Sequence, residues 1–305
     1  MNPLIRIIPA SLVRFFAKPY VAGDSLEKAM EAVRRLRDER GLLSTLDLLA
    51  EDIREQGQVD RNVQAYMDMV DAAAATPAAD RPTLSLKPSS YTTRPLHEGG
   101  DAAGSREALW QIIQKAAAAG VDVSVDMEGR QWTDFTLDAL QRFHAEGARN
   151  VGCVLQTRLN RTEQDLAALP EGTRVRLVIG IYQEPAEVAL TDKAAMKARL
   201  LEQAEALLKR GHYVEFATHD VQCVRRFLED VVPRTGVGPD RYEIQMLYGV
   251  PRDRFLADLL RQGVKCRLYV PFALGWDLAI EYLRRRLDEY PAMMWLVTKN
   301  MFLRR

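Results

Sequence analysis

Cysteine is scarce in this sequence, and neither sign of charge is in excess. The three cysteines among its 305 residues, Cys153, Cys223 and Cys266, lie far apart and form no C-x-x-C pair. This spacing suits neither a disulfide framework nor a zinc site, so we expect a protein of the reducing cytoplasm without a metal. Lys and Arg together number 42, as do Asp and Glu. A duplex nucleic-acid binder usually has a clustered basic surplus, so we expect no nucleic-acid partner.

Long hydrophobic runs are also missing. No apolar run reaches the roughly eighteen residues that a transmembrane helix requires. Residues 1–23 carry Arg6, Arg14 and Lys18 but no acidic residue, and Arg6 interrupts their apolar stretch. A secretory signal therefore fits poorly, and we expect an amphipathic helix that packs on the body of the protein.

Both ends of the chain combine apolar and basic residues. Residues 292–305 carry Lys299, Arg304 and Arg305 and, like residues 1–23, no acidic residue. Such segments suit an anionic membrane surface, where each Lys or Arg contributes about 1 kcal/mol. Alternatively, both segments cover the body of the protein and bury their apolar residues. Peripheral membrane contact and simple covering both remain open.

Short apolar runs alternate with helical patterns from about Leu43 onward. This alternation indicates a parallel sheet, and eight units over about 250 residues match a closed (β/α)8 TIM-type barrel. An open doubly wound sheet is the alternative, but no G-x-G-x-x-G follows any predicted strand. The predicted strands are Leu43–Leu49, Thr83–Lys87, Val121–Met127, Val151–Gln156, Arg174–Ile179, Tyr213–Ala217, Tyr242–Leu247 and Lys265–Val270. The predicted helices include Arg106–Ala118, Asp134–Glu146, Lys193–Lys209, His219–Asp230, Arg252–Arg261 and Asp277–Glu289.

The predicted fold class is therefore α/β, a (β/α)8 barrel with extra N-terminal helices. Residues 1–42 are expected to form a helical segment packed on the barrel. Residues 43–305 are expected to form the barrel itself with a C-terminal helix and tail.

Polar residues stand where most of the predicted strands end. Active sites of such barrels lie at the C-terminal ends of the strands, so these side chains should converge on one rim. Any one of them could be polar merely because it meets water, but so many together indicate a functional site. They are Glu51, Lys87, Asp126, Gln156, Thr218, His219, Asp220, Gln245, Tyr248 and Tyr269.

The last predicted helix carries a cluster of basic residues. Tyr282, Arg285 and Arg286 are spaced i, i+3 and i+4, which places them on one helical face. Two guanidiniums on one face can bind a carboxylate or a phosphate through paired hydrogen bonds. The alternative, which spacing alone favours, is a solvated basic face that pairs with Glu281 and Asp288.

Nine short segments together resemble the proline dehydrogenase family, in its FAD-dependent, monofunctional bacterial form. Gln245–Gly249 is identical to the family motif Q-M-L-Y-G, and Arg176–Tyr182 is similar to R-L-V-K-G-A-Y. Each segment alone is weak evidence, but nine in the family's order, most of them at strand ends, form a specific pattern. The others are Tyr20–Ser25, Leu46–Glu51, Leu86–Lys87, Val125–Glu128, Val154–Gln156, Ala217–Asp220 and Tyr282–Glu289.

The resemblance implies oxidation of L-proline to 1-pyrroline-5-carboxylate, the first step of proline catabolism. Hydride would pass from proline C5 to N5 of a non-covalent FAD, and the electrons would pass on to a membrane quinone. Arg176 would lie near flavin N5 and stabilise negative charge there. The cofactor-binding residues implied by the resemblance are Met127, Gln156, Arg176, Ile179, Gly180, Ile181, Thr218, His219 and Glu289.

The resemblance also implies a substrate site. Lys87, Arg285 and Arg286 would clamp the proline carboxylate, a proximity effect that holds C5 against the acceptor. Leu247, Tyr269 and Tyr282 would shape the ring pocket. Glu51 would act as a gate by pairing with Arg285 once substrate is bound. The implied catalytic residues are Asp126, which would orient this network, Arg176 and Tyr269.

Three positions bear on how closely this chain follows the family. Ile179 stands where the family usually has lysine, and Asp220 replaces an asparagine. Together they predict altered handling of the pyrophosphate or adenosine of FAD. Tyr269 leaves little room for a 4-hydroxyl group, so proline is expected to be preferred over hydroxyproline.

Two other functions remain open. One is a flavin barrel of the methylenetetrahydrofolate reductase type, which would leave the paired arginines Arg285 and Arg286 unexplained. The other is a catalytically silent barrel that acts as a binding or scaffold protein. Flavin colour in the purified protein, and its bleaching by proline, would separate the three.

Overall fold

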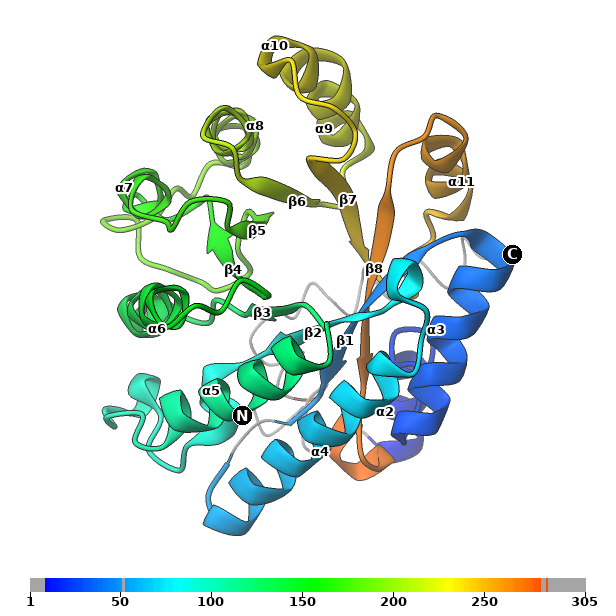
Figure 1. Cartoon of the computed structure of the whole chain (residues 1–305), viewed down its shortest axis with the longest axis vertical. Coiled ribbons are helices and arrows are strands. Elements are labelled where there is room, and N and C mark those ends of the chain that lie inside the picture. Colours follow the sequence, from blue (N-terminus) through cyan, green and yellow to red (C-terminus); the bar gives the residue numbers. More distant parts are fainter. Residues whose placement is uncertain (1–8, 51–52, 281–283, 285–305) are drawn as a thin grey trace.

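Eight parallel strands close into a barrel at the centre of the molecule (Figure 1). The computed structural model describes residues 9–50, 53–280 and 284. The strands are β1 (Leu43–Leu48), β2 (Thr83–Leu86), β3 (Val123–Val125), β4 (Val151–Gln156), β5 (Arg174–Val178), β6 (Tyr213–Ala217), β7 (Tyr242–Leu247) and β8 (Cys266–Phe272). Each strand pairs with the next along the chain, and β8 pairs with β1. The predicted (β/α)8 barrel is confirmed.

Two strands, β3 and β8, differ from their prediction by two residues at an end, and the others agree within one residue. β3 is shorter than Val121–Met127: the nitrogen of Asp126 still donates to the Leu86 oxygen at 2.8 Å, but the ladder toward β4 ends at the pair Val125 and Cys153. β8 runs two residues beyond Val270, because Pro271 and Phe272 continue in register with β1. Strand ends depend on the neighbouring strand, which the local sequence does not contain.

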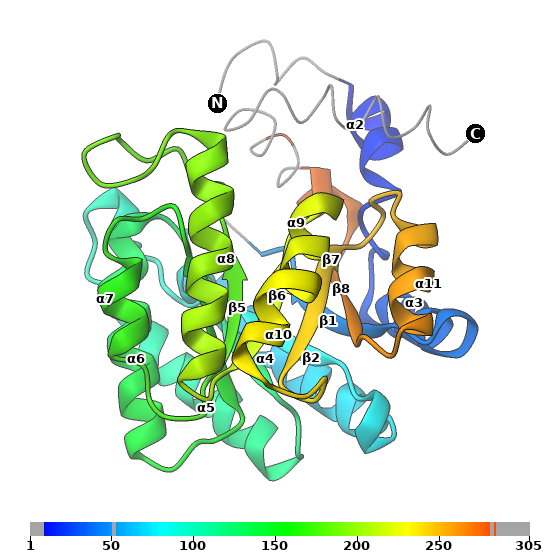
Figure 2. The same ribbon diagram turned by 90° about the horizontal axis from the view of Figure 1, so that it is seen from above.

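Helices surround the barrel on the outside (Figures 1 and 2). They are α4 (Gln56–Ala74), α5 (Ser105–Ala118), α6 (Thr133–Ala145), α7 (Thr162–Ala167), α8 (Lys193–Lys209) and α11 (Asp253–Arg261). The predicted helices in these regions agree within one residue. Short 3-10 turns occur at η1 (Ala78–Asp80), η2 (Pro88–Tyr91), η3 (Leu96–Glu98) and η4 (Arg130–Trp132).

The helix predicted over His219–Asp230 is wrong at both ends. It consists of α9 (Val221–Arg226), the π-helical segment η5 (Phe227–Val231) and α10 (Val232–Thr235). It begins at Val221 because the Asp220 carboxylate accepts hydrogen bonds from the nitrogens of Gln222 and Cys223, both at 3.0 Å. Pro233 follows the π segment, where its missing N–H cannot form the regular α-helical bond.

Within the described residues, two helices precede the barrel: α2 (Ala10–Ala17) and α3 (Leu26–Arg40). Ser25 caps α3 by accepting from the Lys28 nitrogen, and α3 packs against β1 and β8. Val13 of α2 is buried against Leu49 and Ala273, at the end of the barrel toward which the strands run (Figure 2). No helix among the described residues is long and apolar enough to cross a membrane.

The two faces of the strands differ in chemistry. Outward residues such as Leu46, Val175 and Phe216 are buried against the helices and form the main hydrophobic core. Most inward residues are polar, with Val154 as an exception, whereas the interior of such barrels is usually filled by branched aliphatic side chains. They include Thr45, Thr83, Ser85, Arg176, Glu215, Glu243, Gln245 and Arg267, all buried.

Candidate active site

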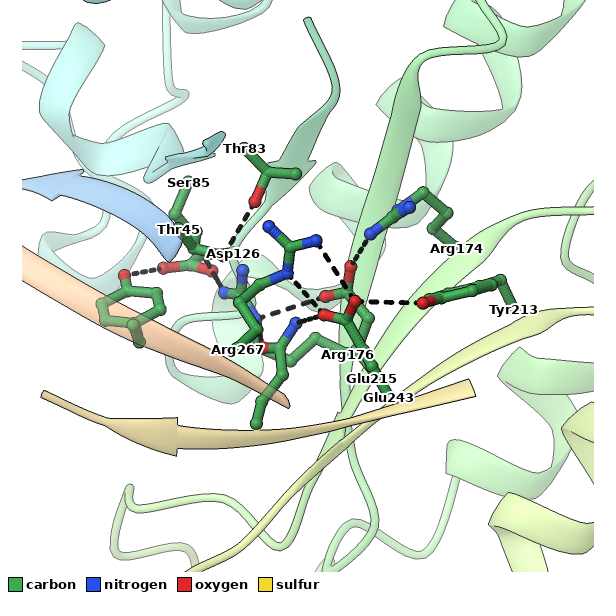
Figure 3. Close-up of polar contacts among 12 residues, drawn as sticks. Thr45, Thr83, Ser85, Asp126, Arg174, Arg176, Tyr213, Glu215, Glu243 and Arg267 are labelled. Atoms are coloured by element: carbon green, nitrogen blue, oxygen red, sulfur yellow. Dashed lines mark hydrogen bonds and ion pairs between the residues drawn. The ribbon is translucent and has the colours of Figure 1, made fainter. Parts of the chain in front are cut away.

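Three predicted residues from distant strands meet at the C-terminal end of the barrel. Asp126 follows β3, Arg176 lies on β5 and Tyr269 lies on β8. One Asp126 oxygen accepts from Arg176 Nη1 at 2.7 Å, and the other accepts from the Tyr269 hydroxyl at 2.9 Å. Ser85 of β2 donates to Asp126 at 2.6 Å (Figure 3). The structure therefore brings the predicted catalytic group together.

Arg176 is the centre of this group. Its Nε donates to Gln245 Oε1 at 2.9 Å, and its Nη1 lies between Asp126 and the Ser85 hydroxyl. Burial lowers the pKa of Arg176, but the carboxylates of Asp126 and Glu215 outweigh it and raise the pKa above the ordinary value. The guanidinium is therefore a permanent cation. Its third nitrogen, Nη2, is buried and has no hydrogen-bond partner among the described residues.

Tyr269 acts as a hydrogen-bond donor rather than as a base. Burial raises its pKa well above the ordinary value, and the nearby carboxylates of Asp126 and Asp47 raise it further. Its ring lies 4.9 Å from the guanidinium carbon of Arg176, which is a cation–π distance. The phenol and the guanidinium thus hold each other and Asp126 in one arrangement.

Lys87 is paired with a carboxylate that strand-end reasoning missed. Its Nζ lies 2.5 Å and 2.6 Å from the two carboxylate oxygens of Asp47, and both side chains are buried. Burial raises the pKa of Asp47, although Lys87 counteracts that rise. Lys87 and Asp47 therefore form a buried ion pair that joins the end of β2 to β1.

Gln156 and Gly180 form a second part of the rim. Gln156 Nε2 donates to the Glu128 oxygen at 2.7 Å, while Gln156 Oε1 is buried without a partner among the described residues. Gly180 has φ 104°, and a Cβ on it would lie 2.5 Å from Gln156 Oε1. Only glycine fits there without strain. Three other residues expected to bind the cofactor differ in exposure: Met127 is buried, Ile179 is half-buried and Ile181 is 63% exposed.

His219 and Thr218 follow β6 on the same rim. His219 Nε2 accepts from the Leu247 nitrogen at 2.9 Å, so this ring nitrogen carries no proton. Burial, helped by the Arg252 guanidinium, lowers the pKa of His219 to about 4. The neutral ring therefore connects the end of β6 to Leu247, the last residue of β7.

Asp220 has a local structural role that its sequence position did not predict. Its carboxylate caps α9 and lies 2.5 Å from Lys197 Nζ of α8. The Lys197 hydrogen bond lowers the pKa of Asp220 below its ordinary value. Its negative charge is thus paired with a lysine of the neighbouring helix, and the expected effect of Asp220 on FAD binding stays a prediction.

The comparisons with known proteins agree with this geometry. The sequence profile described as proline dehydrogenase matches residues 29–295. The chain belongs to the proline dehydrogenase family. A proline dehydrogenase of Deinococcus radiodurans is 35% identical, over 93% of this chain and 89% of that protein. Proline dehydrogenase 1 of Bacillus subtilis strain 168 is 29% identical, over 98% of this chain and 94% of that protein.

Solved structures show the same fold at lower sequence identity. Proline utilization A of Bdellovibrio bacteriovorus, inactivated by N-propargylglycine, matches with a TM-score of 0.79 and 22% identity over 91% of this chain. Proline utilization A of Bradyrhizobium japonicum matches with a TM-score of 0.70 and 20% identity over 89% of this chain. This chain spans about a third of those longer proteins, 33% and 30% respectively.

Several site residues expected for a proline dehydrogenase lie outside the described residues. They are Glu51, Tyr282, Arg285, Arg286 and Glu289. The expected carboxylate clamp and gate therefore stay predictions, and Lys87 is the one residue of this set that the structure describes. Among the described residues, no group of three His, Cys, Asp or Glu side chains could hold a metal ion.

Strand-end reasoning also missed residues inside the barrel. Arg174, Glu243 and Arg267 each stand two positions before an inward residue of the rim, so they share its face. This period-two alternation was the available signal, and it was visible in the sequence. The functional candidates it would have added are Asp47, Ser85, Glu215, Glu243 and Arg267.

Proposed function

We propose that this chain is a flavin-dependent proline dehydrogenase that oxidises L-proline to 1-pyrroline-5-carboxylate. The observation that carries the proposal is Nη2 of Arg176, which is buried and has no hydrogen-bond partner among the described residues. A buried donor without a partner costs about 1–3 kcal/mol, so such a group at the rim of a barrel is best explained by a ligand. The family membership of the chain supplies the class of reaction.

The rim suits the polar ring of a flavin. Arg176 Nη2 offers a donor and Gln156 Oε1 offers an acceptor, and both are buried without protein partners in the described part of the chain. Gly180 keeps the surface beside Gln156 free of a side chain. FAD would be held by these residues with Met127, Ile179, Ile181, Thr218 and His219, and by Glu289 beyond the described part. When bound, FAD supplies the acceptor for the hydride of proline C5.

The protein's own groups bind and orient the substrate. Lys87, with Arg285 and Arg286, holds the proline carboxylate, and Leu247, Tyr269 and Tyr282 surround the ring. Asp126 fixes Tyr269 and Arg176 relative to each other through its two oxygens. Arg176 stabilises negative charge that develops beside it, without needing to reorganise.

A membrane quinone is the proposed final electron acceptor, and peripheral contact with an anionic membrane is proposed with it. Phe15, Leu274 and Leu278 are large apolar residues that remain 58%, 46% and 43% exposed near the end of the barrel. Arg14 lies on the same helix, α2, as Phe15, and Lys18 follows that helix. Co-sedimentation with anionic and neutral vesicles, with and without deletion of residues 298–305, tests the contact. Equal sedimentation with both lipids would count against it.

The decisive experiment is anaerobic addition of L-proline to the purified protein, followed by its visible absorbance. A flavin band that proline bleaches supports the proposal. Colourless protein that FAD cannot reconstitute favours the silent barrel. A flavin band bleached by a reduced nicotinamide but not by proline favours a reductase of the methylenetetrahydrofolate type.

The carboxylate clamp has a separate test. Arg285→Met and Arg286→Met should each raise the KM for proline about ten- to a hundredfold, since a charge-assisted contact contributes roughly 1.5–3 kcal/mol. FAD content should stay near that of the unmodified protein. A normal KM in either variant would show that the carboxylate binds elsewhere.

A further inference from the structure

Below Arg176, a chain of hydrogen bonds continues into the barrel (Figure 3). Gln245 Oε1 accepts from Arg176 Nε at 2.9 Å, and Gln245 Nε2 donates to Glu243 Oε1 at 2.7 Å. Glu243 is bound by Arg267 through Nε at 2.5 Å and Nη2 at 3.2 Å. Gln245, Glu243 and Arg267 are all buried. These hydrogen bonds therefore link the rim to the middle of the barrel interior.

This row of hydrogen bonds fixes the direction of the Gln245 amide. A guanidinium can only donate and a carboxylate can only accept, so the amide oxygen must face Arg176 and the amide nitrogen must face Glu243. Burial opposes ionisation of Glu243, but the Arg267 guanidinium outweighs it and keeps the pKa below the ordinary value. Glu243 is therefore a permanent acceptor, and the amide has one orientation.

The same hydrogen bonds determine the direction in which Arg176 presents its nitrogen Nη2. The guanidinium is a rigid planar fork. With Nε fixed by Gln245 and Nη1 fixed by Asp126 and Ser85, the plane and rotation of the group are determined. Nη2 is then the nitrogen left for a ligand. Loss of the Gln245 contact would leave Nε only its longer ion pair with Glu215 Oε2, at 3.6 Å, beside the contacts of Nη1.

We propose that Gln245 and Glu243 are positioning residues that hold Arg176 Nη2 toward the reacting groups. This inference rests on the proposed function, because it takes Nη2 to face the flavin. Glu243 acts through Gln245, and neither side chain needs to contact substrate or cofactor. If these residues only supported the barrel, they would stabilise the fold but would not change the midpoint potential of the flavin.

The test compares Gln245→Met with Tyr213→Phe in the flavin-loaded enzyme. Gln245→Met removes both amide contacts with little change in length. Tyr213→Phe is the matched control, since it removes the 3.0 Å bond from Tyr213 to Glu243 Oε2 but leaves the Gln245 link intact. The readouts are the flavin midpoint potential, measured by dye equilibration, and the separate kcat and KM for proline.

We expect Gln245→Met to make reduction about tenfold less favourable, a shift of about 30 mV to more negative potential. Its kcat should fall about tenfold with KM within about twofold, the pattern of an interaction made mainly in the transition state. Tyr213→Phe should match the unmodified enzyme in both. If Gln245→Met is unstable, Gln245→Asn, which keeps the amide but is too short to link both partners, replaces it with the same expectation.

Two outcomes would overturn the inference. If Gln245→Met leaves the flavin midpoint potential unchanged, or if Tyr213→Phe shifts it equally, the hydrogen bonds below Arg176 have only a structural role. The proposed function would then still stand. Unmodified protein that takes up no flavin, or whose flavin proline does not reduce, would overturn the proposed function and this inference together.

Discussion

The two halves of the barrel interior are filled in different ways. At mid-height, β1 to β4 contribute short residues, among them Thr45, Thr83, Ser124 and Gly152. Strands β5 to β8 contribute long charged residues, which include Arg174, Arg176, Glu215, Glu243 and Arg267 (Figure 3). The short half leaves room that the long half fills.

This unequal filling lets side chains reach across the barrel axis. Arg176 on β5 donates to the Ser85 hydroxyl on β2 at 3.0 Å and to Asp126, which follows β3, at 2.7 Å. Bulky aliphatic residues on β1 to β4 would block both contacts. The site thus depends as much on small residues in one half as on charges in the other, and the two kinds of substitution should fail differently.

Removing the central charge of the long half should have the largest effect. Arg176→Met leaves the buried carboxylates of Asp126 and Glu215 without their shared cation, which should lower the free energy of unfolding by about 3–5 kcal/mol. Proline oxidation should fall by at least about a hundredfold. Urea unfolding and a dye-coupled assay measure the two effects. Arg176→Lys, the control, should recover stability more than activity, because it restores the charge but not the planar fork. Stability within about 1 kcal/mol of the unmodified protein for Arg176→Met would contradict the comparison.

Enlarging the short half should cost less, and for a steric reason. A Cβ at Gly152 would lie 2.4 Å from the Arg174 backbone oxygen, so β4 and β5 must shift to admit it. Gly152→Ala should lower the free energy of unfolding by about 1–3 kcal/mol, as overpacking does. Ser124→Ala, on the residue paired with Gly152, is the control and should cost less than about 1 kcal/mol. Equal costs measured by urea unfolding would show that space is not limiting in this half.

Tyr269 tests the contact between the halves at the rim. Tyr269→Phe removes the hydroxyl bond to Asp126 but keeps the ring over Arg176. A bond to a charged group contributes about 1.5–3 kcal/mol, so kcat/KM should fall about tenfold or somewhat more. Tyr269→Ser removes the ring as well and should narrow the preference for proline over 4-hydroxyproline. If Phe and Ser variants show the same preference, the ring does not determine specificity.

The smallest predicted effect is a pH dependence at the end of the long half. His219 has a folded pKa of about 4, below the roughly 6.5 of an unfolded histidine. Between these two pKa values, His219 is therefore protonated in the unfolded chain but neutral in the folded protein. Its contribution to stability is complete above about pH 6.5 and is lost as the pH falls toward 4, at no more than about 1.4 kcal/mol per pH unit.

The matching variant is His219→Gln, which offers an acceptor to the Leu247 nitrogen but does not titrate. The drop in Tm between pH 7 and pH 5 should be smaller in this variant than in the unmodified protein. Two other buried histidines whose pKa burial lowers, His144 and His212, are present in both and cancel. An identical drop in both proteins would remove His219 from the pH response.

Much of the fold was predictable because its signals are local. The strand over Tyr242–Leu247 and the helix over Lys193–Lys209 were placed correctly from apolar runs and helical patterns. The rim residues Asp126, Arg176 and Tyr269 were also found, since resemblance and strand ends pointed to them. Errors arose where a distant partner decides the outcome, as at the short β3, and where a local signal was not used, as at the Asp220 cap of α9.

Sequence alone thus determined the barrel, the inward face of each strand and the family, because periodicity and motif order are properties of the chain itself. Only the tertiary structure decided which inward groups meet. Lys87 pairs with Asp47, Arg176 bonds Gln245 and Asp126, and Arg176 Nη2 finds no partner in the part of the chain that the structure describes. Closing eight strands into a ring sets which residues face each other across the axis, and that depends on the register of every strand at once.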